Sequence, residues 1–72
     1  MKYLVVVEKG VENYSAYLPD LPGCTSAGNT LEETLQGIRE AVEGHVELMR
    51  ESGEPVPAPS SEAAFVEVPM AV

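Results

Sequence analysis

The stretch that decides the fold is Pro19-Asp20-Leu21-Pro22-Gly23-Cys24, which is followed six residues later by Thr30-Leu31-Glu32-Glu33. The two prolines of the first stretch have no backbone N–H to donate, so a strand that precedes them must end at Leu18. In the second stretch Thr30 is a good helix N-cap, and Glu33 stands three residues later, as a capping box requires. The two stretches therefore predict strands first and then a helix.

Three strands are predicted before the helix. The apolar, β-branched run at 3–7 predicts a strand at about 2–8. Turn residues at 9–13 separate it from a second strand at about 13–18, so the two strands form an antiparallel hairpin. A short, weakly apolar segment predicts a third strand at about 23–28.

One long amphipathic helix is predicted at about 31–52, with Gly53 as its C′ residue. Its apolar positions recur at spacings of three and four, as on one face of a helix. Three prolines make 54–61 an extended connector, and the apolar residues that follow predict a last strand at about 63–68. The apolar helical positions are Leu31, Leu35, Ile38, Val42, Val46 and Met49.

The predicted order of strand, strand, strand, helix and strand indicates a single α+β domain that spans residues 1–72. A small antiparallel-rich sheet would carry the helix on one face. A domain of this size has a marginal core. Its one cysteine and one histidine exclude an internal disulfide and a Cys/His zinc framework. Self-association is the remaining common source of stability, so we expect a homo-oligomer.

Charge narrows the choice of partners. Twelve acidic residues against four basic ones give a formal net charge of −8. Such a chain repels phosphate backbones, so direct nucleic-acid binding is not expected, whereas a basic protein would be attracted. No apolar run is long enough for a signal peptide or a membrane span, so we expect a cytoplasmic protein without membrane contact. The unpaired Cys24 agrees with that compartment.

No catalytic, cofactor-binding or metal-binding residues are predicted, because no carboxylate pair, metal cluster or activated nucleophile can be assembled. The chain is therefore not expected to be an enzyme or to hold a cofactor. A small enzyme that uses Cys24 or Asp20 is a minor alternative. Whether Cys24 or the single histidine, His45, has a role beyond packing is left open at this stage.

The residues that we consider for partner binding are acidic. Four glutamates fall within a narrow arc of the predicted helix, opposite its apolar stripe, and form either a solvated face or a landing surface for a basic partner. Asp20, the only aspartate, makes either an Asx-type turn contact or an exposed carboxylate for a partner's Arg or Lys. The candidate partner-binding residues are Asp20, Glu33, Glu40, Glu47 and Glu51.

Two glycines inside the predicted helix are a candidate close-packing site. Gly37 and Gly44 share a face with Ala41, and each glycine costs about 1 kcal/mol relative to alanine. They are either simply tolerated, or the backbone of a partner subunit or of the 54–61 connector passes close over them.

The residues at 17–24, 28–33 and 51–57 together resemble the HicB-like antitoxin family, in order and with suitable spacing. The segments are Tyr17-Leu18-Pro19-Asp20-Leu21-Pro22-Gly23-Cys24, Gly28-Asn29-Thr30-Leu31-Glu32-Glu33 and Glu51-Ser52-Gly53-Glu54-Pro55-Val56-Pro57. The resemblance implies a partially degraded ribonuclease H-like fold, homo-oligomers and a role in a toxin–antitoxin system. It also implies a partner, because antitoxins of this family bind and block HicA, a small basic toxin that cleaves mRNA.

The resemblance leads to a non-catalytic protein-binding domain that neutralises a HicA-type toxin. The alternative is a stand-alone oligomeric HicB-like protein with another regulatory partner or ligand and no toxin. Antitoxins of this family usually add a C-terminal DNA-binding domain, and no such segment is recognised up to Val72, so operator binding is not expected.

Overall fold

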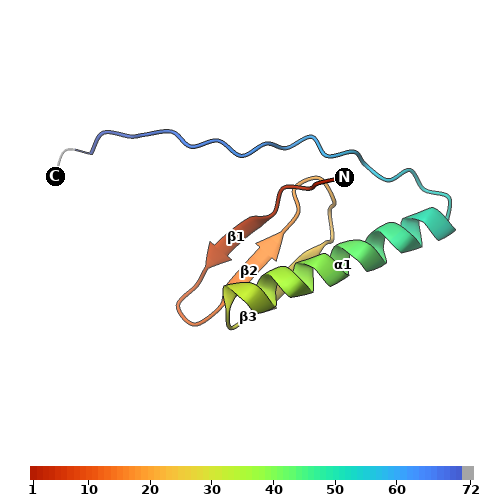
Figure 1. Ribbon diagram of the computed structural model, residues 1–72, viewed down its shortest axis with the longest axis horizontal. Coiled ribbons are helices and arrows are strands. Elements are labelled where there is room, and N and C mark those ends of the chain that lie inside the picture. Colours follow the sequence, from red (N-terminus) through yellow and green to blue (C-terminus); the bar gives the residue numbers. More distant parts are fainter. Residues whose placement is uncertain (71–72) are drawn as a thin grey trace.

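The structure is a computed structural model that describes residues 1–70, and it has two layers. Strands β1 (Val6–Lys9), β2 (Tyr14–Tyr17) and β3 (Thr25–Gly28) form an antiparallel sheet in the order β1-β2-β3. Helix α1 (Leu31–Glu51) lies across one face of this sheet (Figure 1). The predicted α+β class, with an antiparallel sheet and one long helix packed on it, is confirmed.

The pairing register assigns the side chains of β1 to the two faces of the sheet. Val7 lies opposite Ala16, which is buried under the helix, whereas Val6 lies opposite Tyr17 on the other face. The same register explains why β1 begins at Val6, later than predicted. Val5 would lie opposite Leu18, whose amide donates to Cys24 instead, and the next pair would need Pro19, which has no N–H for a ladder.

Two successive β-turns connect β2 to β3. The carbonyl of Leu18 accepts from the amide of Leu21 at 3.3 Å, and the carbonyl of Leu21 accepts from the amide of Cys24 at 3.2 Å. Each turn has a proline at its second position. Gly23, the third residue of the second turn, has a φ of +93°, as a type II turn requires. Residues 18–24 therefore form two consecutive turns, which we call the double turn.

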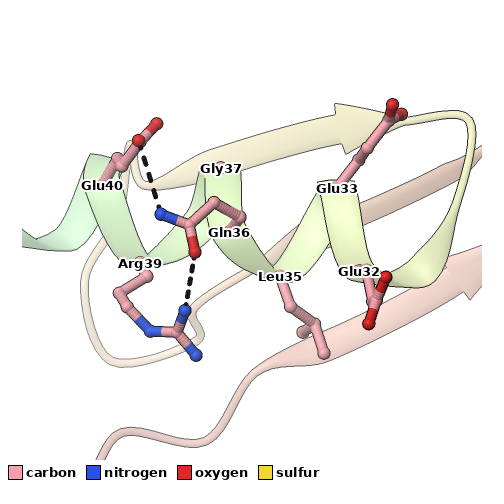
Figure 2. Close-up of a pocket in the computed structure, with 7 residues that line it drawn as sticks. All are labelled: Glu32, Glu33, Leu35, Gln36, Gly37, Arg39 and Glu40. Atoms are coloured by element: carbon pink, nitrogen blue, oxygen red, sulfur yellow. Dashed lines mark hydrogen bonds between the residues drawn. The ribbon is translucent and has the colours of Figure 1, made fainter.

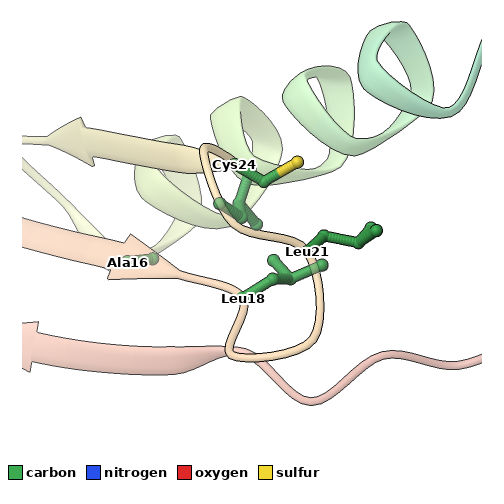
Figure 3. Packing of buried hydrophobic residues seen from close by; sticks show 5 residues of the cluster. Ala16, Leu18, Leu21 and Cys24 are labelled. Carbon is green, nitrogen blue, oxygen red and sulfur yellow. The ribbon is translucent and has the colours of Figure 1, made fainter. Parts of the chain in front are cut away.

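The double turn supplies much of the hydrophobic core. Leu18, Leu21 and Cys24 recur every three residues, and the two turns direct all of these side chains into the space between sheet and helix (Figure 3). Leu21 is fully buried, with an exposed fraction of 0%. The buried cluster consists of Ala16, Leu18, Leu21, Cys24 and Ile38, and Tyr3, Val5, Leu35, Val42 and Val46 pack against it.

Both ends of α1 are closed by hydrogen bonds that the sequence predicts. The Thr30 hydroxyl accepts from the amide of Glu33 at 3.1 Å, and the Glu33 carboxylate accepts from the amide of Asn29 at 2.9 Å. At the other end the amides of Gly53 and Glu54 bond carbonyls of the last helical turn. The helix therefore begins where the capping residues place it and ends one residue earlier than predicted.

The last predicted strand, at about 63–68, is not formed. Residues 54–70 contain neither helix nor strand, and they run past the N-terminus and away from the sheet (Figure 1). Phe65, in the middle of this segment, is 99% exposed. An alternating apolar pattern gives a strand only where a neighbour supplies hydrogen bonds, and the single chain places no neighbour beside this segment.

The close-packing site divides into two parts. A Cβ on Gly37 would collide with the hydroxyl of Ser26 in β3, which donates to the carbonyl of Thr34 at 2.9 Å. Ala41 is half-buried, and its carbonyl lies 4.0 Å from the Cys24 thiol. A Cβ on Gly44 would meet no atom of the described residues within 4 Å. The connector therefore does not cover Gly44, and contact there with a partner subunit stays a prediction.

We predict that Gly37→Ala and Gly44→Ala have different effects on the free energy of unfolding. Gly44→Ala raises it by about 0.5–1 kcal/mol, because alanine favours the helix and the site is open. Gly37→Ala displaces the Ser26 hydroxyl from its bond to Thr34, a loss of about 1 kcal/mol that cancels the helical gain. Urea denaturation measures both.

The control for this pair is the Ser26→Ala background, which removes the colliding oxygen. There Gly37→Ala should recover the gain that Gly44→Ala shows. An equal gain from both substitutions in the wild-type background would contradict the close approach of α1 to β3.

Candidate functional site

The four candidate glutamates of α1 lie on one exposed side of the helix. Glu33, Glu40, Glu47 and Glu51 are all exposed, while Ile38 on the opposite side is buried against the sheet. The helix therefore presents an acidic face, defined by these four residues, along its whole length.

The N-terminal half of the acidic face is tied into local hydrogen bonds. Glu33 caps the helix, as described above. The Arg39 guanidinium donates to the Gln36 amide oxygen at 2.8 Å, and the Gln36 amide nitrogen donates to the Glu40 carboxylate at 3.5 Å (Figure 2). These residues surround a shallow depression of about 640 Å³ on the helix surface. Arg39 thus offsets part of the negative charge there.

The C-terminal half of the acidic face also contains one basic residue, Arg50, which lines a shallow depression with Glu43, Glu47 and Glu51. Glu47 and Glu51 have no hydrogen-bond partner among the described residues, and Glu43 stands one turn before Glu47. Like charges at i,i+4 destabilise a helix by a few tenths of a kcal/mol per pair. The repulsion between these glutamates is therefore only partly offset by Arg50, and a role of Glu47 and Glu51 in partner binding stays a prediction.

Asp20 binds the C-terminal segment of its own chain. Its Oδ2 accepts from the amides of Ser60 at 2.9 Å and Ser61 at 3.0 Å. Its Oδ1 accepts from the hydroxyls of the same serines, at 2.9 and 2.8 Å respectively. The double turn places this carboxylate where it can receive all four donors. Both oxygens are thus used within the chain, and contact between Asp20 and a partner stays a prediction.

The four donors also change the acidity of Asp20. The amide of Ser60 has the largest effect, followed by the amide and hydroxyl of Ser61, and together they lower the pKa of Asp20 from its usual 3.8 to about 2. Because the pKa is lower in the folded chain, the contact contributes stability above about pH 4. That contribution is lost as the pH falls through about 2.

A second anchor holds the same segment. The Tyr3 hydroxyl donates to the carbonyl of Pro57, so the connector is fixed to the start of the chain as well as to the double turn. No sequence pattern predicts that Ser60, Ser61 or Tyr3 belongs to a site. A lone aspartate at a turn and two adjacent serines are the only sequence signals, and nothing local relates them across 40 residues.

The structure makes Cys24 a packed residue. Its thiol is buried, burial raises the pKa of Cys24, and its hydrogen-bond acceptor is the main-chain carbonyl of Ala41. Gly23, next to it, lies beside the half-buried His45: a Cβ on Gly23 would be 3.9 Å from the His45 ring. Among residues 1–70 no group of three or more His, Cys, Asp or Glu side chains could hold a metal ion.

Comparison with known sequences identifies the family. Residues 3–70 match the sequence model of a family described as HicB_like antitoxin of bacterial toxin-antitoxin system. The chain belongs to the HicB-like antitoxin family. The resemblance found in the double-turn and helix-cap residues is therefore confirmed over nearly the whole sequence.

Individual relatives of this HicB-like chain differ in length. It is 36% identical over 69 residues to a 14.9 kDa protein from the rep-hol intergenic region of Haemophilus phage HP1, covering 96% of this chain and 52% of that protein. A UPF0150 protein of Thermoplasma acidophilum is 35% identical over 67 residues, covering 92% of this chain and 97% of its own.

Antitoxin HicB 2 of Photorhabdus laumondii is 32% identical over 73 residues, covering 100% of this chain and 52% of its own. This HicB-like chain thus spans about half the length of the phage and Photorhabdus proteins and nearly all of the Thermoplasma protein.

Two solved structures share the fold. A chain of the "HicA3 and HicB3 toxin-antitoxin complex" superposes with a TM-score of 0.69 at 35% identity, covering 83% of this HicB-like chain and 70% of that chain. The N-terminal domain of the Burkholderia pseudomallei antitoxin HicB superposes with a TM-score of 0.72 at 37% identity, covering 81% and 69% respectively. Within residues 1–70 of the HicB-like chain, no helix has the length and apolar character to cross a membrane.

We predict that acid releases the C-terminal segment before the fold is lost. Protonation of Asp20 between about pH 4 and pH 2 removes the acceptor of the Ser60 and Ser61 amides, so their hydrogen exchange loses protection. At neutral pH Asp20→Asn should have the same effect. Glu54→Gln, which removes an exposed carboxylate of the connector, is the matched control and should leave the two amides protected. Unchanged protection in Asp20→Asn would contradict the assigned contact.

Proposed function

We propose that this HicB-like chain is the antitoxin of a toxin–antitoxin pair and neutralises a small, basic, mRNA-cleaving toxin of the HicA type. The observation that carries the proposal is the likeness to a chain of the HicA3 and HicB3 complex at 35% identity over 83% of this sequence. The net charge of −8 adds a physical reason, because opposite net charges accelerate association.

The acidic face is the surface that we assign to the toxin. It lies on the side of α1 away from the core, so a partner can reach Glu40, Glu47 and Glu51 without disturbing the packing of Ile38. The toxin would offer Lys or Arg side chains, which pair with carboxylates. Neutralisation would follow from covering the catalytic surface of the toxin.

The antitoxin would act by binding alone, in the cytoplasm and without a cofactor. Cys24, the one thiol, is buried and holds its proton, so it is a poor nucleophile. The carboxylate of Asp20 is occupied by four donors from its own chain. Neither residue is available for the chemistry that the enzymatic alternative would require.

Co-expression with the small basic protein encoded by the neighbouring gene tests the proposal. The two chains should purify as one complex, and growth arrest caused by the basic protein alone should be relieved. If the proteins neither copurify nor relieve toxicity, the antitoxin proposal is wrong, and a stand-alone HicB-like protein with another partner takes its place.

We predict that Glu47→Lys has opposite effects on folding and on toxin binding. The substitution replaces two like-charge pairs, with Glu43 and Glu51, by two opposite-charge pairs, and this reversal raises the free energy of unfolding by about 1 kcal/mol. The same lysine repels a basic partner, so the complex should weaken on the order of tenfold. Thermal denaturation and isothermal titration calorimetry measure the two effects.

Glu12→Lys is the matched control, because it makes the same change of net charge in the exposed β1–β2 turn. It should weaken binding far less than Glu47→Lys at physiological salt, where charges beyond a Debye length of about 8 Å are screened. Equal losses in the two variants would show that net charge, and not the acidic face, governs the interaction.

A further inference from the structure

An open apolar groove lies between α1 and residues 1–5, the segment that leads into β1. The helix packs over β3 and β2 but does not reach β1, so Val7 on the helix-facing side of β1 remains 38% exposed. The groove has a volume of about 490 Å³. Its apolar lining includes the buried Leu18 and Ile38, and also Tyr3, Val5, Leu35 and Val42, which are only half-buried in the single chain.

The groove is basic at its rim, unlike the rest of the molecule. Lys2 and Arg39 line it, and they are two of only four basic residues in the chain. None of the described residues that line it is acidic, although the chain has twelve acidic residues. An occupant that combines apolar side chains with carboxylates would therefore fit this site best.

The C-terminal segment 62–70 has that composition and is not packed against its own chain. Phe65 is 99% exposed, Val66 83% and Val68 66%, and the only charged residues of the segment are Glu62 and Glu67. The radius of gyration is 14.8 Å, against roughly 11 Å expected for a compact chain of this length. An exposed apolar strand-like segment of this kind usually marks an interaction site.

We propose that two copies of this chain exchange their C-terminal segments, each inserting residues 62–70 along the β1 edge and into the groove of the other. β1 is an edge strand of the sheet, so one side of it offers unpaired N–H and C=O groups. The inserted segment adds a fourth strand to each sheet by main-chain hydrogen bonds. The second copy supplies the neighbour that the segment lacks in the single chain.

The alternating side chains of residues 62–70 suit the two faces of the sheet that the segment would extend. Successive side chains of a strand point to opposite faces, so Val66 and Val68 lie on one side and Phe65 on the other. Val66 and Val68 would fill the groove beneath α1. Phe65 would cover the opposite face of the sheet, where the register places the half-buried Val6 beside Tyr17, which is 42% exposed.

The anchors favour exchange with a second copy over folding back. Asp20 and Tyr3 hold residues 57–61 against the body, and the segment leaves this point already extended and directed past the β1 edge (Figure 1). In the described chain the C-terminal segment extends away from the body even though the groove of the same chain is open. An ordered exit with an extended apolar end is what a reciprocal exchange between identical subunits requires.

The exchanged dimer leaves the acidic face uncovered. The groove uses the flank of α1 that carries Leu35, Arg39 and Val42, whereas the acidic face carries Glu40 and Glu47. The exchange is therefore independent of the proposed antitoxin function. A negative result for one proposal does not contradict the other. Self-association tests the exchange, and binding to a basic protein tests the antitoxin function.

Sedimentation equilibrium of the whole chain and of two serine variants tests the exchange. The wild-type chain should reach twice the 7.7 kDa of one chain. Phe65→Ser should raise the dissociation constant at least about tenfold, because a buried aromatic anchor is lost. Val11→Ser is the matched control: Val11 is 102% exposed in the β1–β2 turn, lies outside the exchange and should not change self-association.

A charge swap between groove and segment distinguishes exchange from folding back. Lys2→Glu with Arg39→Glu makes the groove acidic, and Glu62→Lys with Ala64→Lys makes the groove-facing side of the segment basic, because positions 62 and 64 share a face with Val66 and Val68; all four positions are exposed, so the core stays intact. In a homodimer of either double variant, segment and groove carry the same charge at both interfaces, so the homodimer should dissociate. Mixed together, they match at both interfaces, so a heterodimer should form.

Three outcomes would overturn the proposal. They are a wild-type chain that stays monomeric up to millimolar concentration, a dimer that Phe65→Ser weakens no more than Val11→Ser does, and double variants that fail to form a heterodimer on mixing. Helical circular dichroism confirms that each variant is folded before the comparison.

Discussion

The constraint on which the structure depends most is the left-handed backbone of Gly23 in the second half of the double turn. With a φ of +93° at this position, the chain reverses twice within residues 18–24 and returns to pair β3 with β2. The reversal buries Leu21 completely and places Leu18 and Cys24 beside it. Of the five buried hydrophobic residues among residues 1–70, three come from this one connection.

The same double turn connects the core to the C-terminal segment. Because Asp20 stands at the third position of the first turn, its carboxylate points away from Leu21 and receives four hydrogen bonds from Ser60 and Ser61. One short segment therefore positions the strands, closes the core and fixes where the chain leaves the body. A domain this small gains from such multiple use of a turn, since it has little apolar surface to bury.

The two surfaces that we assign to partners follow from how α1 lies on the sheet. The helix covers β2 and β3, which turns its acidic face to solvent and leaves its other flank open beside β1. An acidic surface suits a basic protein, and an apolar groove with a basic rim suits the acidic, apolar end of the same chain. With such opposite characters, the two surfaces would not compete for the proposed toxin and the proposed second copy.

Local features of the sequence predicted the fold well, and contacts between distant residues were not predicted. Thr30, Glu33 and Gly53 mark the ends of α1 because capping depends on neighbouring residues, and the prolines of the double turn end β2 for the same reason. The packing of Gly37 on Ser26 and the bonds from Ser60 and Ser61 to Asp20 join residues far apart, so no local pattern reveals them. The prediction of a last strand was wrong for the single chain. The apolar pattern at 63–68 indicates that the segment can form a strand, but it does not identify the neighbouring strand.

The most direct test of this account compares L-alanine with D-alanine at position 23. Cys24 allows the chain to be assembled by native chemical ligation of residues 1–23 to residues 24–72. L-Alanine disfavours a positive φ and should lower the free energy of unfolding by about 1–2 kcal/mol, with a parallel loss of exchange protection at Ser60 and Ser61. D-Alanine accepts a positive φ and should keep both at or above the wild-type level. Equal stability and equal protection with the two alanines would contradict the central role of the double turn.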